Sequence, residues 1–161
     1  ELSLRHTKAE FAQCPDSTYI SVPFTLKKLG IDFNFVHKEW ENYYYLTNRV
    51  IDAATSWKPY SYVLGTYMCL SFQYQKPLNL GRGGAILCGF EEDYETLKKM
   101  AYDGRSDDKP WAEQDIDTIG YHYYMTPETA MLGLEKISTV ENNKIWTWRD
   151  YPYLPDMSVF K

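Results

Sequence analysis

The chain has 161 residues, which is long enough for one domain with a hydrophobic core of its own. Its 44% hydrophobic and 24% charged residues are typical of a globular protein, and a net charge of −5 without a basic stretch argues against nucleic-acid binding. No apolar run approaches the ~20 residues of a membrane-spanning helix and no signal peptide is visible, so no membrane partner is expected.

Short helices and strands are expected to alternate along the first half of the chain. Residues 2–13 have the pattern of a helix, and residues 19–24 have that of a strand closed by Pro23. A helical turn follows and ends at Gly30. Apolar runs predict five further strands, at residues 33–36, 42–46, 49–53, 68–72 and 85–88.

The second half carries two clearer helices. The first begins with three acidic residues at 91–93, has two lysines near its end and stops at Gly104, an arrangement that suits the helix dipole. A polar loop is expected over residues 105–118. The second helix starts with Thr126 as N-cap and Pro127 as its first residue.

Strands interleaved with helices predict an α/β fold with a mostly parallel sheet and flanking helices. We expect one domain over residues 1–140. The tail over residues 141–161 is rich in tryptophan, tyrosine and proline and is predicted to be an extended arm lying on another surface. Ligands in such sheets bind at the carboxyl ends of strands, where Asp52 and Ser71 are both expected.

The cysteine content bears on the cellular compartment, and the tyrosine content bears on the kind of surface that the protein presents. Cys14, Cys69 and Cys88 are widely spaced and odd in number, which favours reduced thiols of a cytoplasmic protein over a disulfide framework. Neither the cysteines nor the three scattered histidines form a ligand pattern for a metal. The 15 tyrosines indicate an interface or a polar cleft.

Lys76 carries the strongest chemical signal in the sequence. A hydroxyl stands five residues before it at Ser71, a glycine turn follows at residues 81–84, and Asp52 lies at the end of a short apolar run upstream. A lysine amine can form a Schiff base with an aldehyde, and a buried aspartate can keep a pyridine nitrogen protonated. These residues are the parts of a pyridoxal 5′-phosphate (PLP) site.

Three ordered motifs resemble those of one enzyme family, the DegT/DnrJ/EryC1/StrS group of PLP-dependent sugar aminotransferases. The run Ser71-Phe72-x-x-x-Lys76-x-x-x-x-Gly81-x-Gly83-Gly84 resembles its lysine signature. Residues 50–54 (VIDAA) are similar to its aspartate strand. Residues 120–126 (GYHYYMT) resemble its Gly-Tyr-Asn-Tyr-Arg-Met-Thr segment before a helix.

The resemblance implies a role for each matched residue. Lys76 would form the Schiff base and shuttle a proton, and Asp52 would pair with the pyridine nitrogen. Ser71 would donate to the cofactor phosphate. Thr55 stands where the family usually has glutamine or histidine against the ring hydroxyl. His122 matches an asparagine that reaches the phosphate of the neighbouring subunit, and a histidine can donate the same hydrogen bond.

The resemblance also implies a fold and a reaction. The fold would be the three-layer large domain of fold-type I PLP enzymes, working as a homodimer. The reaction would move an amino group from an amino acid to a keto sugar carried on a nucleotide. Two parts of the family pattern are missing: the phosphate-binding Gly-Thr turn expected before Glu1, and a strand–helix unit between Phe35 and Val50. The small C-terminal domain of the family is reduced to a tail over residues 138–161. We therefore expect an N-terminally truncated or short member.

Other interpretations stay open at this level. The chain could be a non-catalytic remnant of the fold that binds a partner or a sugar nucleotide through its aromatic surface. It could also be a general nucleotide-binding domain that uses the turn at residues 81–84. Individually, Lys76 could be a solvated lysine, Asp52 a turn residue and His122 a packed histidine. Residues 43–45 (YYY) and the tryptophans of the tail could serve packing alone.

Overall fold

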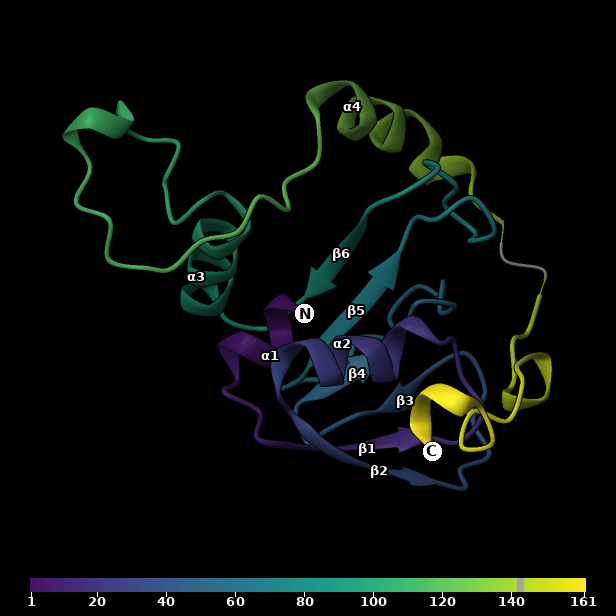
Figure 1. Cartoon of the computed structure of the whole chain (residues 1–161). Coiled ribbons are helices and arrows are strands. Elements are labelled where there is room, and N and C mark those ends of the chain that lie inside the picture. The colour runs from purple at the N-terminus through teal and green to yellow at the C-terminus, as the bar shows by residue number, and fades with distance from the viewer. Residues whose placement is uncertain (142–143) are drawn as a thin grey trace.

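The protein was analysed as a computed structural model that describes residues 1–141 and 144–161 (Figure 1). The described helices are α1 (Leu2–His6), α2 (Ser21–Leu29), α3 (Glu91–Ala101) and α4 (Pro127–Lys136). The described strands are β1 (Phe11–Pro15), β2 (Asp32–Val36), β3 (Tyr44–Tyr45), β4 (Val50–Asp52), β5 (Tyr67–Ser71) and β6 (Gly84–Leu87). Within these residues, no helix combines the length and the apolar character that crossing a bilayer requires.

The strands form two small sheets. Strands β1 and β2 pair in parallel, and the second sheet has the order β3-β4-β5-β6. In the second sheet, β4 and β5 are parallel, whereas β3 and β6 run antiparallel to their neighbours. The α/β class is therefore confirmed, with mixed strand directions in the larger sheet. Because β4 and β5 are parallel, Asp52 and Ser71 lie at the same edge of the sheet.

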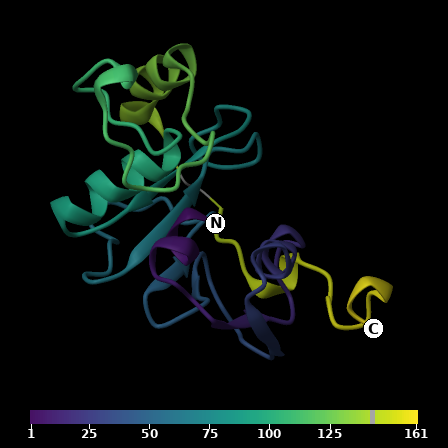
Figure 2. The ribbon, with the colours of Figure 1, turned by 60° about the vertical axis from the view of Figure 1, so that its left-hand side comes forward.

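The main core joins helices to both sheets. Leu4 of α1, Leu26 of α2 and Leu97 of α3 pack in one buried cluster with Val50 and Tyr67 of the larger sheet. These five side chains are each less than 9% exposed. Burial of such side chains is the main term that holds the fold, because each contributes about 1.5–3 kcal/mol relative to an exposed position. Figure 2 shows α1 and α2 lying close to the strands in a second view.

Two expectations for the first 30 residues are wrong. The predicted strand at residues 19–24 lies mostly in helix α2, Ser21–Leu29. Pro23 sits in the first turn of this helix, where a backbone N–H has no intrahelical partner and its loss costs little. The predicted helix over residues 2–13 ends at His6, Lys8 has a φ of 50°, and strand β1 follows. Gly30 ends α2 with a φ of 68°, as predicted.

The elements after residue 30 match the sequence closely. Strands β2, β4, β5 and β6 occur at or within two residues of the predicted runs. Helix α3 carries its acidic first turn and basic last turn, and Gly104 follows it with a φ of 78°. Thr126 caps α4 by accepting a hydrogen bond from the Thr129 amide at 3.4 Å. The predicted third strand shrinks to the two residues of β3.

The C-terminal segment is packed, contrary to the predicted extended arm. The Leu154 side chain is fully buried, and its amide donates to the Asp16 carbonyl at 2.8 Å. Phe160 lies against Phe35 of β2 with ring centroids 5.0 Å apart. Short 3-10 helices at Trp148–Asp150 and Ser158–Phe160 replace the extended chain. The segment thus returns to the beginning of the chain, beside β1 and β2 (Figure 1).

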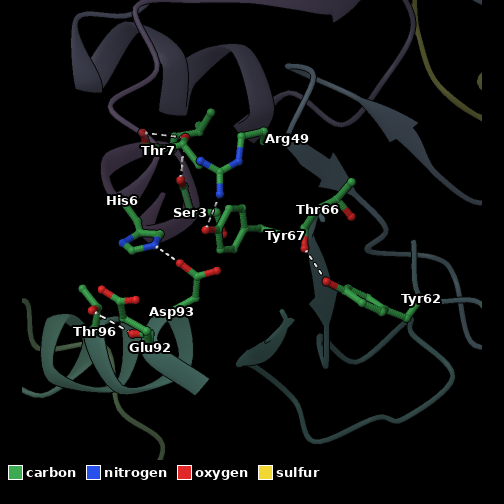
Figure 3. A network of polar contacts seen from close by, with 11 residues as sticks. Ser3, His6, Thr7, Arg49, Tyr62, Thr66, Tyr67, Glu92, Asp93 and Thr96 are labelled. Atoms are coloured by element: carbon green, nitrogen blue, oxygen red, sulfur yellow. Dashed lines mark hydrogen bonds and ion pairs between the residues drawn. The ribbon is translucent and has the colours of Figure 1, made fainter. Parts of the chain in front are cut away.

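A network of polar contacts connects the helices to the larger sheet (Figure 3). The His6 ring on α1 bonds Asp93 on α3 at 2.9 Å. Arg49, just before β4, donates to the Tyr67 hydroxyl at 2.8 Å, and Tyr67 also bonds Asp93. The hydrogen bond from His6, with help from Tyr67, holds the pKa of the Asp93 carboxyl below its usual value.

Asp93→Asn is expected to lower the free energy of unfolding at neutral pH by about 1–2 kcal/mol. The carboxylate has a lower pKa in the folded state than in the unfolded state. Its contribution is therefore complete above the unfolded pKa of about 4 and is lost as pH falls through the folded pKa. Urea unfolding at pH 7 and in steps below pH 4 measures this difference between the two proteins.

Asp107→Asn is the matched control, because Asp107 pairs with Lys98 on the exposed side of α3. Its side chain is 70% exposed, so we expect little change in stability. A stability gap for Asp93→Asn that stayed constant down to the lowest pH would contradict the assigned role of this carboxylate.

Candidate active site

A cavity of about 550 Å³ opens at the carboxyl ends of β4 and β5. Its walls come from four parts of the chain: the loop between β1 and α2 with the start of α2, the segment before β3, the strands with their following turns, and the C-terminal segment. The volume falls within the range of small-molecule sites, about 300–1,000 Å³. This is the position at which ligands bind in open α/β sheets.

Four of the five predicted site residues line this cavity: Asp52, Thr55, Ser71 and Lys76. Asp52 ends β4, Ser71 ends β5, and the other two follow in the turns after these strands. His122 is not among the residues that line it. Its ring is exposed and bonds Asp103 at 3.1 Å, and it lies beside Tyr124. Its predicted role concerns a neighbouring subunit and stays a prediction.

The Asp52 carboxylate is held by two donors. The Ala54 amide donates to Oδ1 at 2.9 Å, an Asx-turn bond that follows from an aspartate at the end of a strand. The Tyr44 hydroxyl donates to Oδ2 at 2.6 Å. Each carboxylate oxygen has a second lone pair, so the group can still accept a hydrogen bond from a ligand in the cavity.

Lys76 combines a half-buried position with a nearby negative charge. A turn places it, because its amide donates to the Gln73 carbonyl at 2.8 Å. Burial lowers the pKa of its ammonium group, Asp52 opposes this shift, and Lys144 adds to it. The net effect is a pKa below that of a free lysine. A larger share of neutral amine follows, and the neutral amine is the nucleophile.

Two lysine ammonium groups lie near the indole ring of Trp146. The Lys76 Nζ atom is 5.1 Å from its centroid, and Lys144 is 3.4 Å from it. Backbone bonds to Asn42 hold Trp146 in place: the Asn42 amide donates to the Trp146 carbonyl at 2.7 Å, and the Trp146 amide donates to the Asn42 side chain at 3.0 Å. The C-terminal segment therefore supplies one wall beside the lysine.

The hydroxyls of Ser71 and Thr55 have local partners. Ser71 Oγ accepts from the Gln73 amide at 3.4 Å, which leaves its proton available for a ligand. Thr55 Oγ1 donates to the Asn42 carbonyl at 2.7 Å, so toward a ligand it can act only as an acceptor. The shorter side chain and this internal bond limit Thr55 to a weaker version of the predicted contact.

The glycine turn at residues 81–84 serves the hairpin rather than the cavity, since none of its residues lines it. Gly81 and Gly83 have φ values of 82° and 99°, which favour glycine. A Cβ on Gly84 would collide with the Leu70 carbonyl oxygen across the β5–β6 pair. The lysine signature therefore includes glycines because β6 must return closely beside β5.

Sequence reasoning missed the aromatic lining of the cavity. Trp40, Tyr44, Trp146 and Tyr151 all face it, and they belong to one packed aromatic cluster. The high tyrosine content indicated a cleft or interface but could not show which rings meet. Only the folded chain brings the C-terminal rings beside residues 40–44.

Comparison with family models identifies one family. Residues 62–145, just over half of the chain, match the DegT/DnrJ/EryC1/StrS aminotransferase family. The match contains Ser71, Lys76 and His122 and begins after Asp52 and Thr55. A comparison with curated proteins finds no match.

A solved structure shares the fold. It is the crystal structure of a "Putative PLP-dependent aminotransferase" from Bacillus cereus ATCC 10987, with a TM-score of 0.66 and 16% sequence identity. The similarity covers 92% of this chain and 50% of that one, so the chain spans about half the length of the structure it matches. The fold-type I α/β architecture is thereby confirmed.

PLP is the cofactor that the family and this structural neighbour imply. The residues present fit it: Lys76 offers an amine of lowered pKa, and Asp52 offers a carboxylate fixed by two donors. Ser71 offers a free hydroxyl proton for a phosphate. Sequence match, fold and donor set lead to one conclusion: the chain belongs to the DegT/DnrJ/EryC1/StrS aminotransferase family.

Proposed function

We propose that this protein is a PLP-dependent aminotransferase that moves an amino group from an amino acid to a nucleotide-linked keto sugar. One observation carries the proposal: Lys76, with its lowered pKa, and the doubly held Asp52 open onto the same cavity. An aminotransferase needs both groups, one to bond and carry protons and one to hold a charge on the cofactor ring.

When bound, PLP withdraws electrons from the carbon that carries the transferred amino group. Lys76 would supply the amine that bonds the cofactor aldehyde and, once displaced by the substrate amine, would carry the proton between the reacting carbons. Asp52 would hold the proton of the ring nitrogen by its negative charge. Ser71 would donate to the phosphate. The rings of Trp146 and Tyr151 would keep water from the lysine.

The aromatic lining supports a sugar substrate. Trp40, Trp146 and Tyr151 present apolar ring faces beside polar groups such as Gln73 and Gln75. A sugar has the complementary surface, with apolar C–H faces and polar hydroxyls, and aromatic rings with polar neighbours suit such amphipathic ligands. An amino acid, for which glutamate is the natural first test, would be the donor.

A second copy of the chain is the proposed partner. Exposed apolar side chains gather on α4 and the segment before it, where Ile119, Met131 and Leu134 are 80%, 63% and 74% exposed. Exposed apolar area of this kind is typical of an interface. His122 lies in the same part of the chain, in keeping with its predicted reach toward a neighbouring subunit. The three free cysteines support a reducing, cytoplasmic compartment.

The test is to mix the protein with PLP, reduce it with borohydride and map the modified lysine by mass spectrometry. We expect modification at Lys76, together with a visible absorbance band before reduction. Lys28 is the internal control, because its bond to Glu1 raises its pKa and keeps it protonated. Label spread evenly over the exposed lysines, with Lys76 unmodified, would refute the proposal.

The second candidate function is a non-catalytic module that binds a sugar nucleotide. The observation in its favour is that the chain spans half of the aminotransferase structure that it matches. This alternative predicts that a nucleotide sugar binds, as measured by calorimetry, while no PLP is bonded to Lys76. The labelling experiment separates the two functions.

A further inference from the structure

Two nearly buried hydroxyls are bonded in series to the carboxylate of the site. Tyr44 on β3 is 3% exposed, and its hydroxyl donates to Asp52 Oδ2 at 2.6 Å. The Thr18 hydroxyl, from the loop between β1 and α2, lies 2.5 Å from the same Tyr44 oxygen. Thr18 is 2% exposed, and both residues belong to the wall of the cavity.

The direction of the protons in this series follows from valence. Tyr44 has one hydroxyl proton, and the ionised Asp52 can only accept, so that proton points at the carboxylate. Thr18 must then donate to the Tyr44 oxygen. Burial, followed by the nearby charge of Asp52, raises the pKa of Tyr44 well above its ordinary value, so the hydroxyl keeps its proton.

The backbone holds this contact in register. Tyr44 and Asp52 are direct partners in the antiparallel β3–β4 pair, and cross-strand partners on one face approach within about 4.5–5.5 Å at their Cβ atoms. Trp40 packs on the Tyr44 ring with centroids 5.0 Å apart. Its indole N–H donates to the Ser17 carbonyl at 2.9 Å, next to Thr18. Trp40, held by this bond, therefore restricts the tyrosine ring.

We propose that Tyr44, supported by Thr18, is a positioning residue that fixes the Asp52 carboxylate for the ring nitrogen of PLP. This inference rests on the proposed function and extends it to a residue outside the three motifs of the sequence. The Ala54 amide holds one oxygen and Tyr44 the other, so the carboxylate cannot rotate away. Charge-assisted hydrogen bonds of this kind are about twice as strong as neutral ones.

The test is a double-mutant cycle on PLP binding. The dissociation constant of PLP is measured by absorbance titration for the wild type, Tyr44→Phe, Asp52→Asn and the double variant. We expect Tyr44→Phe to weaken binding about tenfold, which corresponds to about 1.4 kcal/mol. In the Asp52→Asn background, where no charged carboxylate remains to be positioned, the same change should weaken binding less than twofold.

Tyr45→Phe is the matched control, since Tyr45 is the neighbour on the same strand and its side chain packs on the opposite face with Ile51 and Met68. It should leave the dissociation constant unchanged. Thr18→Val is the second variant, and it should weaken PLP binding by a smaller factor than Tyr44→Phe does. In a protein that already carries Tyr44→Phe, adding Thr18→Val should weaken PLP binding no further. Thr18→Val gives the answer if Tyr44→Phe fails to fold.

Two outcomes overturn the inference. If Tyr44→Phe weakens PLP binding equally in the wild type and in the Asp52→Asn variant, the tyrosine only stabilises the fold. The same conclusion follows if Tyr45→Phe weakens PLP binding as much as Tyr44→Phe does. Failure of the proposed function has a different signature, because borohydride would then leave Lys76 of the wild type unlabelled. In that event the inference falls with it.

Discussion

Lys76→Ala is expected to reduce amine transfer by about 10⁴-fold or more, because it removes both the nucleophile and the proton carrier of the reaction. The measurement is the half-reaction with L-glutamate, followed as the conversion of pyridoxal phosphate to pyridoxamine phosphate by absorbance. The fold should survive, since Lys76 is only half-buried and stands in a turn after β5. Circular dichroism and urea unfolding check that.

Lys76→Arg tests whether the positive charge at this position is enough for activity or whether the reactive amine is needed. Arginine keeps the positive charge beside Asp52 and the contact with the Trp146 ring, but it stays protonated and cannot bond the aldehyde. We expect it to be as inactive as Lys76→Ala. Lys136→Ala, at an exposed lysine on α4 outside the cavity, is the control and should react at the wild-type rate. Substantial activity in Lys76→Arg would show that another amine performs the reaction.

Asp52→Asn is expected to slow the same half-reaction by about 10²–10³-fold, the usual cost of losing one preorganised charge contact. Asparagine has the shape of aspartate but carries no negative charge, so it cannot hold a proton on the ring nitrogen. PLP binding should weaken much less than turnover falls, because Lys76 and Ser71 remain in place. Absorbance titration and single-turnover kinetics measure the two effects separately.

Asp32→Asn is the matched control for this change. Asp32 also stands on a strand, but it is exposed at the start of β2 and lies outside the cavity. It should alter neither binding nor turnover. Equal losses of rate in both variants would indicate general destabilisation, and an unchanged rate in Asp52→Asn would remove this carboxylate from the reaction.

The motif around Lys76 could be identified from the sequence because its information is local. Ser71, Lys76 and the glycines are separated by fixed short distances within one strand, one turn and one hairpin. Helices α3 and α4 were equally visible, since their capping residues and terminal charges act within one turn of the helix. Asp52 followed from its place after a short apolar run.

The errors came from segments whose local signals conflict with their packing. Residues 19–24 are rich in β-branched and aromatic residues and suggest a strand, but packing of Leu26 into the core selects the helix. The tail looked extended because it contains prolines and aromatics. Leu154 is nevertheless buried, and Phe160 packs on Phe35 of β2, a contact across more than 100 residues that local patterns cannot reveal.

By itself, then, the sequence determined the α/β class and the family motifs, and it supplied the candidate lysine and carboxylate of the site. Only the tertiary structure decided what surrounds them: Tyr44 and Thr18 bonded in series to Asp52, and Trp146 beside Lys76. The reason is physical. Spacing along the chain encodes turns and caps, whereas burial, pKa shifts and hydrogen bonds between distant residues exist only once the chain has closed around the cavity.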